Sequence, residues 1–189
     1  RLEYSRFFVF GGEESYGYMG ADFVRDKDGN MATVMFAEIA AYAKSVGKSV
    51  AGVLDDIYKE YGYHLEVNKS VVMEGAEGAA QIASLNNSYS ENKPTEYAGV
   101  KVTNVRDFEK DTFEDSEGDE VPKQGMIIVD LEDGNSFAVR ASGTEPKIKY
   151  YLFGNDAPSD DLNASKASVT KSLEDLWTAI EADMQTRMR

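Results

Sequence analysis

The sequence predicts an α/β fragment followed by an α+β domain with an antiparallel sheet covered by helices. Two helical stripes dominate residues 1–65, whereas residues 66–189 carry alternating apolar residues separated by turn signals. An apolar stripe from Val169 to Met184 supplies a long helix to cover the sheet. We therefore predict two domains, 1–65 and 66–189, with the boundary near Tyr63 to Asn68.

The first part reads as one strand, a loop and two helices. Tyr4 to Phe10 is rich in aromatic residues and predicts a buried strand that runs into a loop at Gly11-Gly12. Helical stripes cover Met31 to Val46 and Ser49 to Tyr61, and each stops at a glycine. The dipeptide Asp28-Gly29, before the first helix, predicts a turn.

The second part alternates strands with one short and one long helix. In chain order we predict a strand region from Leu65 to Met73, a helix over Gly75 to Leu85, a polar linker over Asn86 to Pro94, a strand over Val100 to Phe108, a hairpin of Met126 to Leu131 with Phe137 to Arg140, and a strand over Lys147 to Phe153. In the final helix, Trp177 is expected to anchor the helix on the sheet.

Composition limits the possible partners. Thirty-four acidic against twenty basic residues give a net charge of -14, which argues against nucleic acids and anionic membranes. The chain has no cysteine, so it excludes disulfides, and we expect a cytoplasmic location. No apolar run approaches the roughly eighteen residues that span a bilayer. Because the chain opens at Arg1 directly into an apolar pattern, we expect it to be part of a longer protein.

The stretch from Arg140 to Lys149 has the composition of a phosphate site. Arg140 offers a planar fork of donors for phosphate oxygens. Ser142 and Thr144 add hydroxyl donors, and Gly143 lets the backbone approach an anion. Lys147 is a further candidate contact. The alternative is a polar β-turn whose basic side chains are simply solvated.

A second candidate site follows the first predicted strand. A carboxylate such as that of Glu13 can accept hydrogen bonds from two adjacent hydroxyls, and the Ser15 hydroxyl can both donate and accept, so the pair suits a sugar diol. The alternative is a helix N-terminus with Ser15 as its cap. Arg25 and Lys27 are candidates to face the ligand, or they pair with neighbouring acids.

Two other features receive no ligand role. His64 is the only histidine, and no second metal ligand or facing acid lies near it in sequence. The acidic run from Asp107 to Glu120 does not have the spacing of a calcium loop, so we expect a solvated loop.

Two motifs together resemble the α-D-phosphohexomutase superfamily, the phosphoglucomutase and phosphomannomutase enzymes. Arg140-Ala141-Ser142-Gly143-Thr144-Glu145-Pro146-Lys147 is similar to the phosphate-binding loop of their last domain. Gly12-Glu13-Glu14-Ser15-Tyr16-Gly17 is similar to their sugar-binding loop. The motifs occur in the family's order and at roughly its spacing, and the chain resembles the end of domain 3 and all of domain 4.

The resemblance implies specific roles. Glu13 and Ser15 would bind the sugar, Lys27 would face the cleft, and Arg140, Ser142, Gly143 and Thr144 would bind the non-reacting phosphate, with Lys147 as a weaker candidate. In the family a hexose 1-phosphate and 6-phosphate interconvert through a bisphosphate, with Mg²⁺ and a glucose 1,6-bisphosphate-type activator. The partners implied are a phosphorylated sugar and the missing N-terminal domains.

The chain departs from the family pattern in one large respect. It has neither a Thr-Ala-Ser-His-Asn-Pro-like serine loop nor an Asp-Gly-Asp-x-Asp-Arg metal loop, so we expect Mg²⁺ to bind outside it and the chain alone to be inactive. The form of the sugar loop favours a glucose phosphate, with mannose or pentose phosphate as alternatives. The other class of function is a non-catalytic acidic binding module whose turn at Arg140 has no ligand.

Overall fold

The computed structural model describes residues 9–13, 16–21, 23–24, 26–115, 118–142 and 145–188. The chain forms two compact units, residues 1–57 and 58–189. The division between Ile57 and Tyr58 falls inside a helix. The boundary that the sequence suggested, near Tyr63 to Asn68, falls inside a strand of the second unit, and the domain limits of 1–65 and 66–189 stay a prediction.

The first unit contains a small hairpin and helices. β1 (Gly11–Gly12) pairs antiparallel with β2 (Tyr18–Met19), and α1 (Gly29–Ser45) and α2 (Val50–Tyr61) follow. α1 and α2 confirm the two helices that were predicted over Met31 to Val46 and Ser49 to Tyr61. The N-cap of α1 is Asp28, whose carboxylate accepts hydrogen bonds from the Asn30 and Met31 N–H groups at 2.9 and 3.1 Å.

Some expectations for the first unit require correction. Asp28-Gly29 is not a free turn, because Asp28 caps α1 and Gly29 begins it. Gly11-Gly12 is strand β1, because its backbone pairs with β2. Most of the strand expected over Tyr4 to Phe10 lies outside the described residues. Val9 and Phe10 are described, and they form no strand and are exposed.

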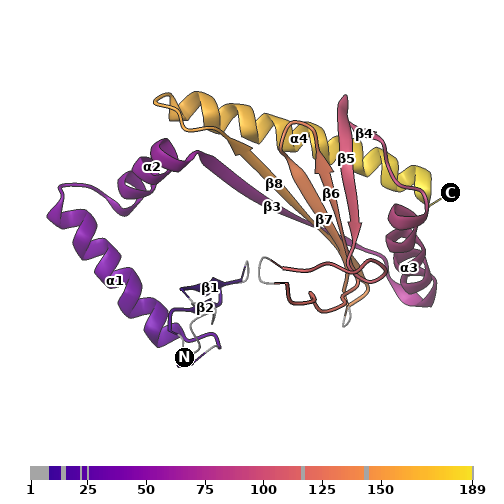
Figure 1. Ribbon diagram of the computed structural model, residues 1–189, viewed down its shortest axis with the longest axis horizontal. Helices are drawn as coiled ribbons and strands as arrows, with labels where there is room; N and C mark the ends of the chain where they lie inside the picture. Colours follow the sequence, from indigo (N-terminus) through magenta and orange to yellow (C-terminus); the bar gives the residue numbers. More distant parts are fainter. Residues whose placement is uncertain are drawn as a thin grey trace. The chain divides into compact units, whose positions relative to one another are not determined.

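The second unit is built on a six-stranded antiparallel sheet with the order β3-β8-β7-β6-β5-β4. The strands are β3 (Tyr63–Val72), β4 (Glu96–Tyr97), β5 (Val100–Asp107), β6 (Met126–Leu131), β7 (Ser136–Ala141) and β8 (Lys147–Asp156). The pairing of β6 with β7 confirms the hairpin predicted for Met126 to Leu131 and Phe137 to Arg140. This unit is therefore the predicted α+β domain (Figure 1).

One face of the sheet carries the hydrophobic core, because alternate residues of each strand point to it. Its buried members include Ile127, Val129, Phe137, Val139, Ile148, Tyr150 and Leu152. The opposite face carries the intervening residues, including Arg140, Lys149 and Tyr151. The alternation therefore separates a packed face from a polar one.

Two helices, α3 (Gly75–Glu91) and α4 (Leu162–Arg187), pack on the core face (Figure 1). Tyr89 of α3 meets Tyr150 edge-on with ring centroids 6.3 Å apart. Trp177 of α4 meets the same ring at 5.5 Å. Trp177 thus anchors α4 on the sheet, as the sequence predicted.

The second unit also corrects three expectations. α3 continues to Glu91, through most of the linker expected over Asn86 to Pro94, because Tyr89, four positions after Leu85, extends the buried face of the helix. The short strand β4 was not predicted. Asp107 begins the acidic run but is buried rather than solvated, because its carboxylate accepts hydrogen bonds from the Glu109 and Lys110 N–H groups.

No helix in the part of the chain that the structure describes is both long enough and apolar enough to span a bilayer.

Candidate functional site

Three basic residues gather where β7 ends and β8 begins. Arg140 lies directly opposite Lys149 in the β7–β8 ladder. Lys147 comes two residues before Lys149 on the same strand, so the period of two places all three on the polar face of the sheet. Arg140 is exposed, and the two lysines are half-buried. The strand register therefore creates a local positive site at this end of the sheet.

The turn between these strands is closed by hydrogen bonds among its described residues. The Ser142 N–H donates to the Lys147 carbonyl at 2.9 Å, and the Glu145 N–H donates to the Ser142 hydroxyl oxygen at 3.3 Å. The Lys147 N–H donates to the Glu145 carbonyl at 2.7 Å. Because the Ser142 hydroxyl accepts from Glu145, its own proton is left to donate to a ligand. Gly143 and Thr144 lie outside the described residues.

Arg140 differs from the other two arginines that the structure describes. The Arg106 guanidinium makes a two-pronged contact with Asp130 at 2.9 and 2.7 Å. The Arg187 guanidinium bonds Asp183 at 2.7 Å. The Arg140 guanidinium has no ion-pair or hydrogen-bond partner among the residues that the structure describes. Within the part of the chain that the structure describes, its donors are thus available to an external anion.

The acidic side chains nearby respond to this positive charge. Lys147 Nζ lies 2.7 Å from Glu145 Oε2, and the contact lowers the pKa of the Glu145 carboxyl, with a smaller contribution from Lys149. The acidic run after β5 leaves the sheet at the same end, because Met126, where the chain re-enters the sheet, pairs with Arg140. One acid, Glu145, is therefore in direct contact with the basic site.

In the first unit, the structure brings Glu13 and Lys27 together. Lys27 Nζ lies 3.4 Å from Glu13 Oε1 and 3.4 Å from Asp26 Oδ1. A Cβ on Gly17 would lie 2.5 Å from Lys27 Cγ and 3.2 Å from Glu13 Oε2, so only glycine leaves room for this contact. These contacts, first with Asp26 and then with Glu13, raise the pKa of Lys27.

Glu13 belongs to a hairpin turn and not to a helix N-terminus. Its N–H donates to the Gly17 carbonyl at 2.8 Å, and Tyr16 adopts a left-handed φ of 66°. The turn joins β1 to β2, so the helix-cap interpretation of Glu13 does not hold. Ser15 and Arg25 lie outside the described residues. The alternative for Lys27 was an ion pair with a neighbouring acid, and the structure contains such a pair with Asp26.

A cavity of about 500 Å³ lies at the opposite end of the sheet, between α4 and the β6–β7 turn. Several of its polar side chains bond to one another. Asn135 Nδ2 donates to Asp133 at 2.9 Å and to Ser172 at 2.8 Å, and Lys171 pairs with Asp175 at 2.7 Å. The cation in its lining, Lys171, is thus paired, whereas Arg140 has no partner among the described residues, so we take the β7–β8 end as the candidate phosphate site.

Two residues of this site, Lys149 and Glu145, were not among the site residues predicted from the sequence. Lys149 becomes a neighbour of Arg140 only through the register, although the alternation of residues 147, 149 and 151 placed it on one face with Lys147. Glu145 connects to both Ser142 and Lys147, a set of contacts that crosses the turn. Only the folded turn reveals it.

Comparisons with known proteins match both units. Residues 2–61 match the family model described as phosphoglucomutase/phosphomannomutase, alpha/beta/alpha domain III, and residues 72–162 match the C-terminal domain of the same family. A phosphoglucomutase of Staphylococcus haemolyticus is 36% identical over 156 residues, which is 80% of this chain and 28% of that protein. One from Staphylococcus epidermidis is 37% identical over 150 residues, or 77% of this chain and 27% of that protein.

A solved structure has a similar fold. The open form of parafusin from Paramecium, a phosphoglucomutase, superposes with a TM-score of 0.62 at 16% identity, over 95% of this chain and 31% of that one. The chain thus spans less than a third of the length of these relatives. Because the two family models together match most of the chain, in the family's order, the chain belongs to the phosphoglucomutase/phosphomannomutase family.

Proposed function

We propose that this chain is the sugar-reading and phosphate-gripping portion of a phosphosugar mutase. The observation that carries the proposal is the Arg140 guanidinium, which has no partner among the described residues and lies opposite Lys149 at the end of a closed turn. A phosphate bound there would meet a planar fork, a lysine and the Ser142 hydroxyl. In a chain with a net charge of -14, such a site concentrates positive charge locally.

Each residue then has a chemical role. Arg140 pairs with the phosphate oxygens of the end of the substrate that does not react, and Ser142 donates its hydroxyl. Gly143 and Thr144 complete the loop in this proposal, on the ground of the sequence. A phosphate held in this way fixes one end of the sugar, and its binding energy positions the other end for reaction.

The turn after β1 is proposed to read the sugar. The Glu13 carboxylate accepts from adjacent hydroxyls, and Ser15 assists it. Lys27, held by Glu13 and Asp26, orients that carboxylate and faces the substrate, together with Arg25. One carboxylate that reads adjacent hydroxyls tolerates both orientations of the sugar, as a 1-phosphate to 6-phosphate exchange requires.

The complete protein is proposed to interconvert hexose 1-phosphate and 6-phosphate through a bisphosphate, with a phosphoserine, Mg²⁺ and a bisphosphate activator. The sequence carries no Asp-Gly-Asp-x-Asp-Arg motif, so we propose that other domains of the complete protein hold the Mg²⁺. This chain alone is expected to show no turnover of glucose 1-phosphate. Turnover by the pure chain would contradict that assignment.

The proposed substrate is a glucose phosphate, because the relatives are named phosphoglucomutases. Mannose and pentose phosphates are the alternatives. Parallel titrations of the chain with glucose, mannose and ribose phosphates rank the three, and tighter binding of mannose or ribose phosphate would overturn the glucose assignment.

The phosphate role is tested with Arg140→Ala. We expect phosphate binding to weaken by about 2 kcal/mol, since a charge-assisted two-pronged contact is lost. Isothermal titration with inorganic phosphate and with glucose 1-phosphate measures it. Lys171→Ala removes the same charge from the exposed pair with Asp175 and is the matched control. Equal effects of both variants would favour a binding module whose turn at Arg140 has no ligand.

Glu13→Gln tests the sugar role separately. It should weaken binding of glucose 1-phosphate but leave inorganic phosphate unchanged, because Glu13 meets hydroxyls rather than phosphate in this proposal. If Glu13→Gln and Arg140→Ala weakened both ligands equally, the assigned roles would be wrong.

A further inference from the structure

We infer that Glu145 is a positioning residue that occupies the Lys147 ammonium and keeps phosphate binding weak enough for release. The inference rests on the proposed phosphate site at the β7–β8 end. It assigns to Glu145 a function that its place in an anion-binding turn does not suggest, because a carboxylate there repels the ligand. Three observations on the described residues carry it.

The first observation is the contact itself. Glu145 Oε2 and Lys147 Nζ lie 2.7 Å apart, and the Lys147 side chain is 21% exposed whereas that of Glu145 is 60% exposed. The ammonium is thus held at the turn by a partner that faces solvent. A phosphate that sought Lys147 would first have to displace this carboxylate.

The second observation is that the backbone of Glu145 already closes the turn. Its N–H donates to the Ser142 hydroxyl oxygen, and its carbonyl accepts from the Lys147 N–H. These bonds do not involve the carboxylate. The carboxylate is therefore not needed to shape the turn, and what it adds is charge and the contact with Lys147.

The third observation is the contrast between the basic side chains. Arg140 has no partner among the described residues, whereas Lys147 is paired with Glu145. The turn thus presents one guanidinium fully and one ammonium partly neutralised. The proposed site must release its substrate and bind it again in the opposite orientation. A moderate affinity for phosphate suits this cycle, because tighter binding of the ground state does not speed turnover.

The test is a double-mutant cycle on phosphate binding. Glu145→Gln keeps the backbone bonds and the side-chain shape, removes the negative charge and frees Lys147. We expect inorganic phosphate to bind about threefold more tightly, a size typical of an exposed ion pair. The affinity should also fall more steeply with salt, because one more cation meets the anion. Glu132→Gln, in the turn at the other end of the sheet, is the charge-matched control and should change nothing.

The second arm of the cycle uses Lys147→Met. In the wild-type chain it should weaken phosphate binding less than about twofold, because Lys147 is already occupied. In the Glu145→Gln background it should remove most of the gain. Glu145→Asp, which keeps a carboxylate near Lys147, should behave as wild type. Thermal unfolding midpoints check that all variants are folded.

The outcomes separate two failures. If Arg140→Ala leaves phosphate binding unchanged, the proposed phosphate site itself is wrong. If Arg140→Ala weakens binding as expected but Glu145→Gln binds phosphate no more tightly than wild type, only the inference is overturned. Equal losses from Lys147→Met with and without Glu145→Gln would also overturn it, because Lys147 would then contact phosphate directly in both.

Discussion

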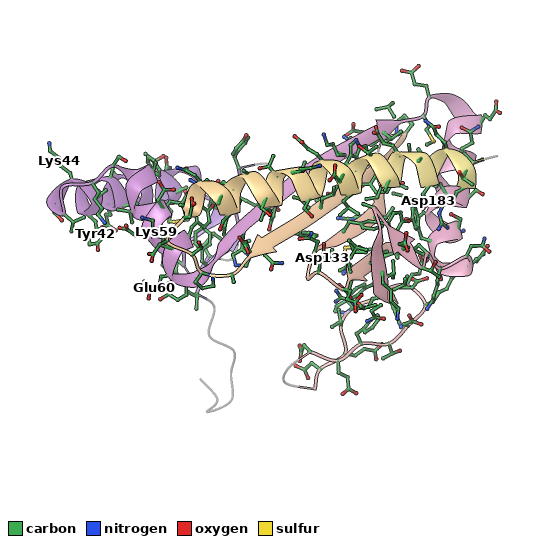
Figure 2. The ribbon with its side chains drawn as sticks, turned by 90° about the horizontal axis from the view of Figure 1, so that it is seen from above. Tyr42, Lys44, Lys59, Glu60, Asp133 and Asp183 are labelled. Atoms are coloured by element: carbon green, nitrogen blue, oxygen red, sulfur yellow. The ribbon has the colours of Figure 1, made fainter. Side chains whose placement is uncertain are left out.

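Arg187 joins the ends of the two helices that cover the sheet. Its guanidinium donates to Asp183 Oδ2 at 2.7 Å and to the carbonyls of Ser88 and Asn92 at 2.9 and 3.0 Å, and it lies over the Tyr89 ring at 4.4 Å. Figure 2 shows Asp183 toward the C-terminal end of α4, beside α3. Only 10% of the Arg187 side chain is exposed, so the Asp183 carboxylate is needed to offset the cost of burying the guanidinium charge.

Asp183→Asn should therefore lower the free energy of unfolding by about 2 kcal/mol or more, since it leaves a mostly buried guanidinium without its counter-charge. Urea unfolding followed by Trp177 fluorescence measures the change. Asp175→Asn breaks an exposed ion pair with Lys171 and should cost at most about 1 kcal/mol. Equal costs for the two variants would contradict the assigned importance of burial.

Tyr150 lies fully buried at the centre of the core, with its hydroxyl 3.1 Å from that of Tyr89. Burial raises the pKa of Tyr150 to about 12. The unfolded phenol ionises near its ordinary pKa of about 10, so the stabilisation is complete below that pH and is lost as the pH rises toward 12.

Tyr150 alone should then reduce the free energy of unfolding by about 2 kcal/mol between pH 9 and pH 12. Urea midpoints across this range, for the wild type and Tyr150→Phe, measure it. Between pH 9 and pH 12, the free energy of unfolding of Tyr150→Phe should fall by about 2 kcal/mol less than that of the wild type. Identical slopes in the two proteins would show that Tyr150 ionises at its ordinary pKa in the folded chain.

At the scale of elements, α4 packs tightly against β8 at Gly154. A Cβ there would lie 2.8 Å from Val169 Cγ1 and 2.9 Å from Leu173 Cγ. These atoms belong to buried side chains, so the helix would have to shift outward. The glycine in the middle of a strand thus marks the line of contact between helix and sheet.

Gly154→Ala should destabilise the second unit by about 1–3 kcal/mol through overpacking. Chemical denaturation measures it. Gly125→Ala is the matched control, because the nearest atom to its Cβ is Glu109 Oε2 at 3.6 Å. If the two variants are equally stable, the contact between α4 and β8 is looser than described.

The elements show how far a sequence predicts this fold. Alternation and turn residues were sufficient for β6, β7 and β8, because each strand has one buried face. The last part of α3, from Asn86 to Glu91, was missed, because Tyr89 is its one large apolar residue among Asn and Ser. The two-residue strand β4 has too few residues to show any period.

The candidate site, too, was predictable from the sequence only in part. The sequence placed Arg140, Ser142 and Lys147 in one turn, and that turn exists. It did not predict that Glu145 pairs with Lys147 or that Glu13 pairs with Lys27, because both contacts depend on how a turn folds back on itself. Side-chain partners across a turn have no periodic signal.

At the scale of the whole molecule, the two units differ in how much they bury. Among the described residues of 1–57, Ala43 is the only one that is buried, whereas the second unit encloses a core of large apolar side chains. Tyr42 and Phe36 of α1 are 58% and 60% exposed. The first unit is therefore expected to be much the less stable of the two.

Urea should then unfold the chain in two steps. All helices contribute to the far-UV circular dichroism, so the loss of α1 and most of α2 should appear as an early partial change, at a lower urea concentration than the change in fluorescence of Trp177, the single tryptophan, in the second unit. Coincident transitions by both probes would show that the two units unfold as one.

The central claim is that the β7–β8 end of the sheet grips phosphate. An amide NMR titration of the chain with glucose 1-phosphate tests it most directly. We predict saturable shifts at Ser142, Glu145 and Lys147, which disappear in Arg140→Ala. Shifts centred on the cavity around Asn135, or shifts that persist unchanged in Arg140→Ala, would contradict the claim.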